Sequence, residues 1–215
     1  MNLLFLDIET TGLDPKTSVI LEISAKLFSE WEKGNVMTPS DTFHRKILYE
    51  SIPQTQLGAL AVNRVKVSDM VVTPPPTLAE SLRIYPQPLL ELVDWLVDAR
   101  ARGEFVIAGH NVNFDLNFIE TKLKDFNITD LKSLTGYRVL DLASVGLFFI
   151  AAGLVPGLEK AGNGDIQKWF GLAKNPNHHT ATADIDMSHV NLLRFIGLVK
   201  DRMIAEHQAG VSSTA

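Results

Sequence analysis

Two carboxylates close an apolar segment near the start of the chain. Residues 3–9 read LLFLDIE, a run with the length and composition of a buried strand, and it ends on Asp7 and Glu9. Side chains at i and i+2 of a strand point to the same face, so these two carboxylates converge. Burying two like charges side by side is costly unless a cation joins them. The pair favours a cation site, although two acids that end a strand in water are an equally good interpretation of this segment alone.

A second polar group, His110-Asn111-Val112-Asn113-Phe114-Asp115, stands where a short apolar strand at 104–109 passes into a helix expected at 113–126. Loops of this kind commonly carry functional residues in α/β proteins. Asp115 would lie in the first helical turn, where the helix dipole by itself also favours an acid. Asn113 could be only an N-cap. This motif alone is weak support for a site.

A third group runs from Asn175 to Asp184 and presents His179 in a turn before a long helix expected at about 180–205. The Asn-Pro turn favours a loop position for His179, from which it could face the same site as Asp184. Asp186 lies about 200° around a regular helix from Asp184, so only one of these two acids can serve that site.

Together these groups offer four carboxylates and one histidine, each at the end of an element. Oxygen ligands of this kind suit hard divalent cations. Two such ions a few ångströms apart can clamp the attacking and leaving oxygens of a phosphoryl displacement. A histidine beside them can take a proton from the attacking water near neutral pH.

The elements that would position these residues follow from the hydrophobic pattern. Strands come first in the chain and helices interleave later, which predicts an α/β protein with a mixed sheet covered by helices. The expected strands are 3–9, 18–28, 41–49, 104–109 and 137–142, and the expected helices are 54–66, 88–101, 113–126, 142–152, 163–170 and 180–205.

The order D-x-E, H-N-x-x-F-D and H-x-x-x-x-D resembles the signature of the DEDDh-type 3′–5′ exonucleases, the histidine subclass that includes polymerase III epsilon proofreading subunits, ribonuclease T and oligoribonuclease. The similarity covers about residues 3–200 and includes the segment 165–172 before the last motif. The region 30–88 departs from the family. Thr180 stands where the tyrosine subclass would carry tyrosine. The resemblance selects Asp184 rather than Asp186.

The resemblance implies a ribonuclease H-like fold, with a five-stranded mixed sheet flanked by helices. No linker is long enough to divide the chain, so we expect a single exonuclease domain over 1–206, and the small polar residues at its end indicate a flexible tail at 207–215. The resemblance also implies two divalent metal ions, Mg²⁺ or Mn²⁺, with Asp7 bridging them. Glu9 and Asp184 would complete the site of the ion that holds the attacking water.

In the same family pattern, Asp115 would serve the second ion, next to the leaving oxygen, and His179 would be the general base. Leu13 would be an apolar wedge against the terminal base. Asn111 and Phe114 would shape the pocket of the 3′ nucleotide. Structural support is a nearly equally good interpretation of these last three residues.

The activity implied is removal of 5′-mononucleotides from the 3′ end of single-stranded DNA or frayed 3′ ends. The segment Thr10-Thr11-Gly12-Leu13 resembles the DNA-directed members more, so DNA is favoured over RNA. Two alternatives stay open. One is an RNA-processing or oligoribonucleotide exonuclease. The other is a non-catalytic module that binds nucleic acid or a polymerase, which would have no chemical need for all five residues.

The amino-acid composition limits the kinds of partner and metal site that the chain could have. The 215 residues contain 20 basic and 25 acidic side chains, a net charge of −5, which excludes a long basic track for nucleic acid. The absence of cysteine excludes disulfides and thiolate metal sites. No apolar run is long enough to span a bilayer, and Asp7 interrupts the N-terminal segment, so we expect neither a membrane span nor a signal peptide. We expect a cytoplasmic, free-standing enzyme of undetermined oligomeric state, with no polymerase partner indicated.

Overall fold

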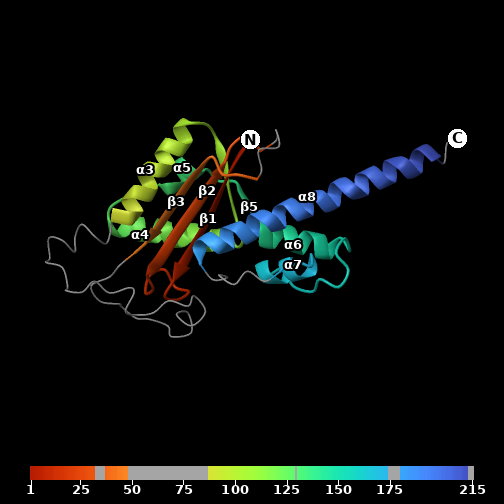
Figure 1. The fold of residues 1–215 in the computed structure, drawn as a ribbon. Helices are drawn as coiled ribbons and strands as arrows, with labels where there is room; N and C mark the ends of the chain where they lie inside the picture. Colours follow the sequence, from red (N-terminus) through yellow and green to blue (C-terminus); the bar gives the residue numbers. More distant parts are fainter. Residues whose placement is uncertain (32–36, 48–86, 129, 174–179, 213–215) are drawn as a thin grey trace.

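A computed structural model of the chain describes residues 1–31, 37–47, 87–128, 130–173 and 180–212. Within these residues, five strands form one mixed sheet in the order β3-β2-β1-β4-β5 (Figure 1). The strands are β1 (Asn2–Thr10), β2 (Ile20–Phe28), β3 (Asp41–Lys46), β4 (Phe105–Gly109) and β5 (Val139–Asp141). The helices are α3 (Gln87–Ala101), α4 (Val112–Asp125), α5 (Leu131–Thr135), α6 (Leu142–Ala151), α7 (Asn163–Trp169) and α8 (Ala181–Ser212).

The central strand is β1, which explains its continuous apolar run. It pairs antiparallel with β2 and parallel with β4, while β2–β3 is antiparallel and β4–β5 is parallel. A strand that has neighbours on both sides and helices over both faces has no face left for water. The five expected strands and the mixed pairing are thus confirmed, and they place β1 at the centre of the sheet.

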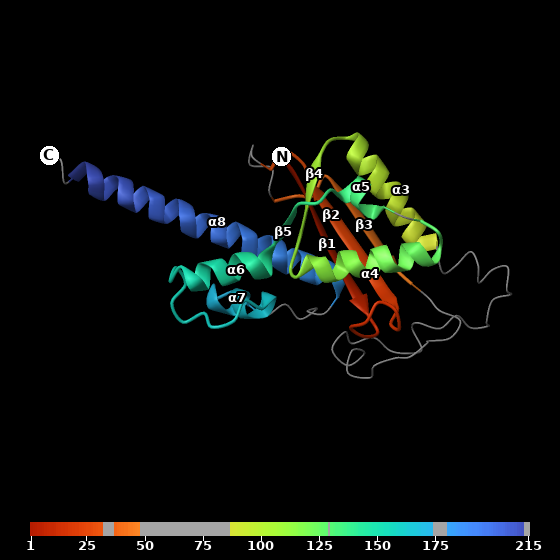
Figure 2. The same cartoon turned by 180° about the vertical axis from the view of Figure 1, so that it is seen from behind.

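Helices cover both faces of the sheet (Figure 2). On one face, Leu4, Leu6 and Ile8 of β1 pack in a core with α3, α4 and α5. On the other face, Leu3 and Phe5 pack against α8 and the start of α6. Because alternate strand residues share a face, Asp7 and Glu9 continue the row of Leu3 and Phe5 and lie on the α8 face.

A third cluster joins α6, α7 and α8 beside the sheet, with Phe149, Ile166 and Phe195 at its centre. The far half of α8 extends away from the rest of the molecule in both views (Figures 1 and 2). Val199 is 40% exposed although Leu192, about two turns earlier on the same side of the helix, is buried, because the helix has run past the sheet by that point.

Two elements differ from the sequence expectations. Helix α8 ends at Ser212 rather than near 205, so most of the tail expected at 207–215 is helical here. The short helix α5 was not expected, because five residues are too few to show a helical period. The helix expected at 54–66 lies outside the described residues. None of the described helices combines the length and apolar character needed to cross a bilayer.

Candidate active site

The first two candidate ligands lie on the central strand. Glu9 is only 8% exposed and Asp7 is half-buried, and β1 continues beyond them to Thr10. The interpretation that both acids simply end the strand in water is therefore wrong. Two carboxylates instead sit inside the molecule, on the face that α8 covers.

The third candidate ligand, Asp184, lies in the first turn of α8. Two side-chain contacts to β2 fix this turn against the sheet. The hydroxyls of Ser24 and Thr182 are 3.1 Å apart, and Lys26 pairs with Asp186. Ser24 lies directly opposite Asp7 in the β1–β2 register, so these contacts hold the start of α8 beside the β1 carboxylates.

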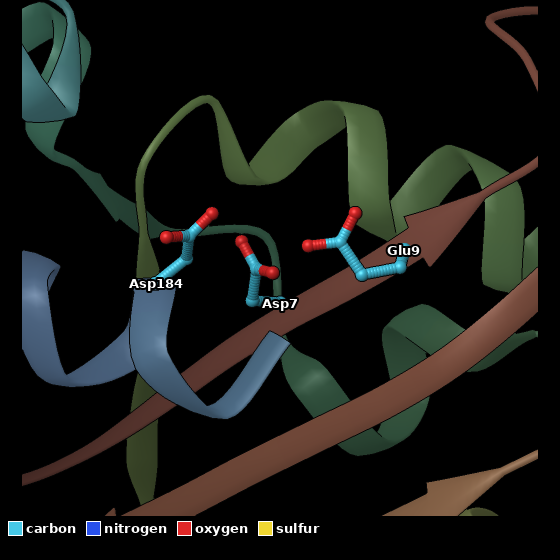
Figure 3. Close-up of side chains that lie close together, drawn as sticks. All are labelled: Asp7, Glu9 and Asp184. Atoms are coloured by element: carbon cyan, nitrogen blue, oxygen red, sulfur yellow. The ribbon is translucent and has the colours of Figure 1, made fainter. Parts of the chain in front are cut away.

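The carboxylates of Asp7, Glu9 and Asp184 converge. One oxygen from each lies within 4.8 Å of the others, and the side chains point toward one another with Asp7 in the middle (Figure 3). Asp186 points to Lys26 on β2 instead. The structure thus brings Asp184, and not Asp186, to the β1 pair, as the sequence motif had selected.

Asp115 approaches the same strand from α4. It is 4% exposed, and its Oδ1 accepts a hydrogen bond of 2.9 Å from the backbone N–H of Ile8. This N–H is on the β4 side of β1, but β4 has already ended at Gly109. The carboxylate of Asp115 therefore accepts the hydrogen bond that a neighbouring strand would otherwise accept. A helix-dipole role alone does not explain this long-range bond. One carboxylate oxygen stays available for other chemistry.

Gly109 makes this junction tight. A Cβ added there would lie 2.8 Å from the backbone oxygen of Leu6 and 3.0 Å from the side chain of Val112. Real Cβ atoms do not approach backbone so closely, which explains the glycine between β4 and the loop that leads to Asp115.

The clustering of acids changes their proton affinity. Burial, followed by the charges of Asp115 and Asp184, raises the pKa of Asp7 well above its usual range. Burial, then Asp184 and Glu22, raises the pKa of Glu9 to about 8. Burial likewise raises the pKa of Asp115 to about 8, against the opposing effect of its hydrogen bond from Ile8. Without a cation this site favours protonated carboxyls, and it would favour a bound cation for the same reason.

The loop before α4 is held by Asp141, a residue that the sequence analysis did not select. Asp141 caps α6 by accepting from Ser144 N, and it also accepts a 2.6 Å bond from the backbone N–H of Asn111. Asn111 is in the left-handed region, with φ 59°. Burial lowers the pKa of His110, against the attraction of Asp141 and Asp184. The only sequence signal for Asp141 was an acid placed before an apolar helix.

The three candidate substrate residues differ in their surroundings. Leu13 is 76% exposed in the loop after β1. Phe114 packs against the core, with its ring 4.9 Å from that of Phe118. Asn111 contributes its backbone to the loop as described above. His179 lies outside the described residues.

The donor set fits a divalent metal ion. Three carboxylates from β1 and α8 offer only oxygen atoms, within 4.8 Å of one another, and repulsion between them is relieved by a cation. Oxygen-only ligands favour Mg²⁺ or Mn²⁺ over softer metals.

The fold resembles solved nuclease structures. The nuclease domain of 3′hExo, a DEDDh family member bound to rAMP, matches with a TM-score of 0.66 and 15% identity, over 91% of this chain and 92% of that one. Exonuclease I matches with a TM-score of 0.64 and 18% identity, over 93% and 41%. Exonuclease I of E. coli in complex with a dT13 oligonucleotide gives 0.63 and 16%, over 95% and 43%. The ribonuclease H-like fold expected from the sequence is confirmed.

In sequence, the chain is similar to DNA polymerase III PolC-type from Clostridium perfringens (strain 13 / Type A), with 27% identity over 178 residues. This match covers 83% of the chain and 10% of that polymerase, so the chain spans about a tenth of its relative's length. No family model matches the sequence. The structural matches confirm the fold that the resemblance to the DEDDh-type exonucleases implied, and the match to this relative is consistent with that resemblance.

Proposed function

We propose that this protein is a metal-dependent 3′–5′ exonuclease that removes 5′-mononucleotides from single-stranded or frayed 3′ ends. The observation that carries the proposal is the convergence of Asp7, Glu9 and Asp184 on a DEDDh nuclease fold. Asp115 of α4 contacts the same end of β1 by accepting a hydrogen bond from the backbone N–H of Ile8. All four carboxylates of the motif set therefore border one strand end, as a phosphodiester hydrolase of this kind requires.

In this proposal Asp7, Glu9 and Asp184 would hold one divalent ion, and Asp7 and Asp115 would hold a second. Bound there, Mg²⁺ or Mn²⁺ would lower the pKa of a water and neutralise the charge on the scissile phosphate. Asp115 can take part because Ile8 N engages only its Oδ1.

His179 is the proposed general base, because a histidine can accept the proton of the attacking water near neutral pH. The resemblance supports this role, because His179 and Asp184 match the H-x-x-x-x-D motif and the Asn-Pro turn favours a loop position for His179. Its replacement by alanine should remove a contribution of about 10²–10⁴-fold to the rate.

For the substrate, the wedge role of Leu13 is supported by its exposed apolar side chain in the loop after β1, the strand that carries Asp7 and Glu9, since this side chain has no core to support. A wedge stacks on any base, which suits an enzyme that degrades without sequence preference. The net charge of −5 fits a short grip at the 3′ end rather than a long track along the strand. Phe114 packs against the core, and from there it would form part of the wall of the pocket for the 3′ nucleotide.

DNA is the favoured substrate. The relative similar in sequence is a DNA polymerase III, and a structural match carries a dT13 oligonucleotide. RNA is the second candidate, because the first structural match was bound to rAMP and another recognises a histone mRNA stem-loop.

Matched 5′-labelled oligonucleotides test both candidates. With Mn²⁺ or Mg²⁺, the purified protein should shorten single-stranded DNA from its 3′ end in single-nucleotide steps, faster than double-stranded DNA or RNA. Faster degradation of RNA would select the second candidate. Intact DNA and RNA with metal-loaded protein would reject the enzyme and favour a binding module.

A further inference from the structure

A fifth carboxylate, from the neighbouring strand, borders the proposed metal centre. Glu22 of β2 is paired directly with Glu9 of β1 in the antiparallel register. Directly opposed residues share a face, with Cβ atoms about 5 Å apart. Glu22 is 6% exposed, so its charge is not shielded by bulk water. It therefore faces the same site as Glu9 from the side away from β4.

This arrangement is unfavourable for the fold alone. Like charges that lie directly opposite each other in a sheet are destabilising, and burial strengthens the repulsion. The charge of Glu22 is among the causes that raise the pKa values of both Asp7 and Glu9. A negative phosphate of the substrate would be repelled by it as well. A cation is the species that would make a fifth carboxylate favourable here.

Glu22 is also held in a defined orientation. His44 of β3 places its Nε2 2.7 Å from Glu22 Oε1. The histidine reaches diagonally, because its own register partner is Ser24, while Lys46 is the residue directly opposite Glu22. The side chain of His44 is 48% exposed and that of Glu22 is 8% exposed. The pair thus links the solvent edge of the sheet to the carboxylate cluster.

Glu22 does not belong to the three side chains whose oxygens lie within 4.8 Å of one another. Residues just outside the ligand set of a metal orient the ligands and metal-bound water, and their loss typically lowers metal affinity about 10–100-fold. We propose that Glu22 is an outer-sphere carboxylate of the metal centre and that His44 is the positioning residue that orients it. This inference rests on the proposed function.

Direct Mn²⁺ binding tests the proposal without relying on activity. The electron paramagnetic resonance signal of free Mn²⁺ is titrated with the full chain and with Glu22→Gln, His44→Ala and the double variant. Glu22→Gln should bind Mn²⁺ about 10–100-fold more weakly. His44→Ala should weaken binding less, and the double variant should be no weaker than Glu22→Gln, because His44 acts through Glu22. His44→Gln, which can still donate to Glu22, should recover part of the affinity.

Two matched controls separate this role from general effects. Thr42→Ala removes an exposed neighbour of His44 on the same strand and face, and Glu104→Gln removes a carboxylate that is 93% exposed. Both should bind Mn²⁺ like the wild type. The melting temperature in EDTA distinguishes the proposed role of Glu22 from a purely structural one. If Glu22 only supported the fold, Glu22→Gln would lower this temperature. Removing a charge opposite Glu9 should leave the melting temperature unchanged or higher.

The outcomes are distinct. Wild-type affinity in both Glu22→Gln and His44→Ala would overturn the inference and leave the proposed function standing. A lower melting temperature in EDTA with unchanged Mn²⁺ affinity would show a structural role and would also overturn it. A wild-type protein that binds no Mn²⁺ would remove the metal centre itself, and the proposed function with it. If Glu22→Gln does not fold, the half-exposed His44 variants carry the same test.

Discussion

Without metal, the protein should lose stability as pH rises, because burial raises the pKa values of Glu9 and Asp115 in the folded protein. The pKa of Glu9 is raised from 4.5 to about 8, and that of Asp115 from 3.8 to about 8. Between the ordinary values and about 8, the folded state binds more protons than the unfolded chain. The stability contributed by each group is therefore fully present below its ordinary pKa and is lost as pH rises toward 8.

The size of this effect follows from the raised pKa values. One pKa unit corresponds to about 1.4 kcal/mol, so a buried group such as Glu9 accounts for on the order of several kcal/mol by pH 8. In a protein of this size, 1 kcal/mol corresponds to about 2–4 °C in melting temperature. We expect the melting temperature in EDTA to fall by on the order of 10 °C between pH 5 and pH 8.

Thermal melting in EDTA and in saturating Mn²⁺ across this pH range is the assay. Metal binds the ionised carboxylates, so Mn²⁺ should stabilise the protein more at pH 8 than at pH 5. Glu9→Gln should flatten the EDTA profile, because it removes one of the groups that keep a proton. A melting temperature in EDTA that stays flat or rises from pH 5 to pH 8 would refute the electrostatic account of the site.

Three further variants probe separate parts of the structure. Asp7→Ala should abolish metal-dependent nucleotide release, since it removes the central carboxylate of the cluster. Release at the wild-type rate would contradict the assignment of Asp7 to the metal site. Gly109→Ala should cost about 1–3 kcal/mol, because its Cβ would lie 2.8 Å from the oxygen of Leu6, and urea unfolding measures this. Asp186→Asn should leave nucleotide release within about twofold of wild type, since an ion pair of this exposure is worth little; a large loss would mean that the wrong acid of α8 was chosen.

Much of the site could be predicted from the sequence because its residues sit at fixed points of regular elements. Asp7 and Glu9 share a face by the two-residue period of a strand, and the structure confirms that they do. The helical period places Asp184 and Asp186 on different sides of α8. In the structure Asp184 lies beside the β1 carboxylates, and Asp186 pairs with Lys26. The motif order then added the family resemblance that composition alone could not give.

The parts that the sequence missed depend on pairing between distant segments. Glu22 faces Glu9 only through the β1–β2 register, and the sequence gives no means of fixing that register. The bond between Asp115 and Ile8 joins residues 107 positions apart. Asp141 holds the Asn111 loop through a backbone N–H, which leaves no side-chain pattern to recognise. The one local signal for Glu22 was an acid between apolar neighbours, Leu21 and Ile23, in the expected strand 18–28.

The most direct test of the central claim compares two neighbouring acids on α8 in one nuclease assay. Wild type, Asp184→Asn and Asp186→Asn are each incubated with a 5′-labelled single-stranded DNA, with Mn²⁺ or with EDTA. The account predicts stepwise shortening from the 3′ end by wild type and Asp186→Asn, only with Mn²⁺, and none by Asp184→Asn. Shortening by Asp184→Asn at the wild-type rate, or shortening by wild type in EDTA, would contradict a metal centre built on Asp7, Glu9 and Asp184.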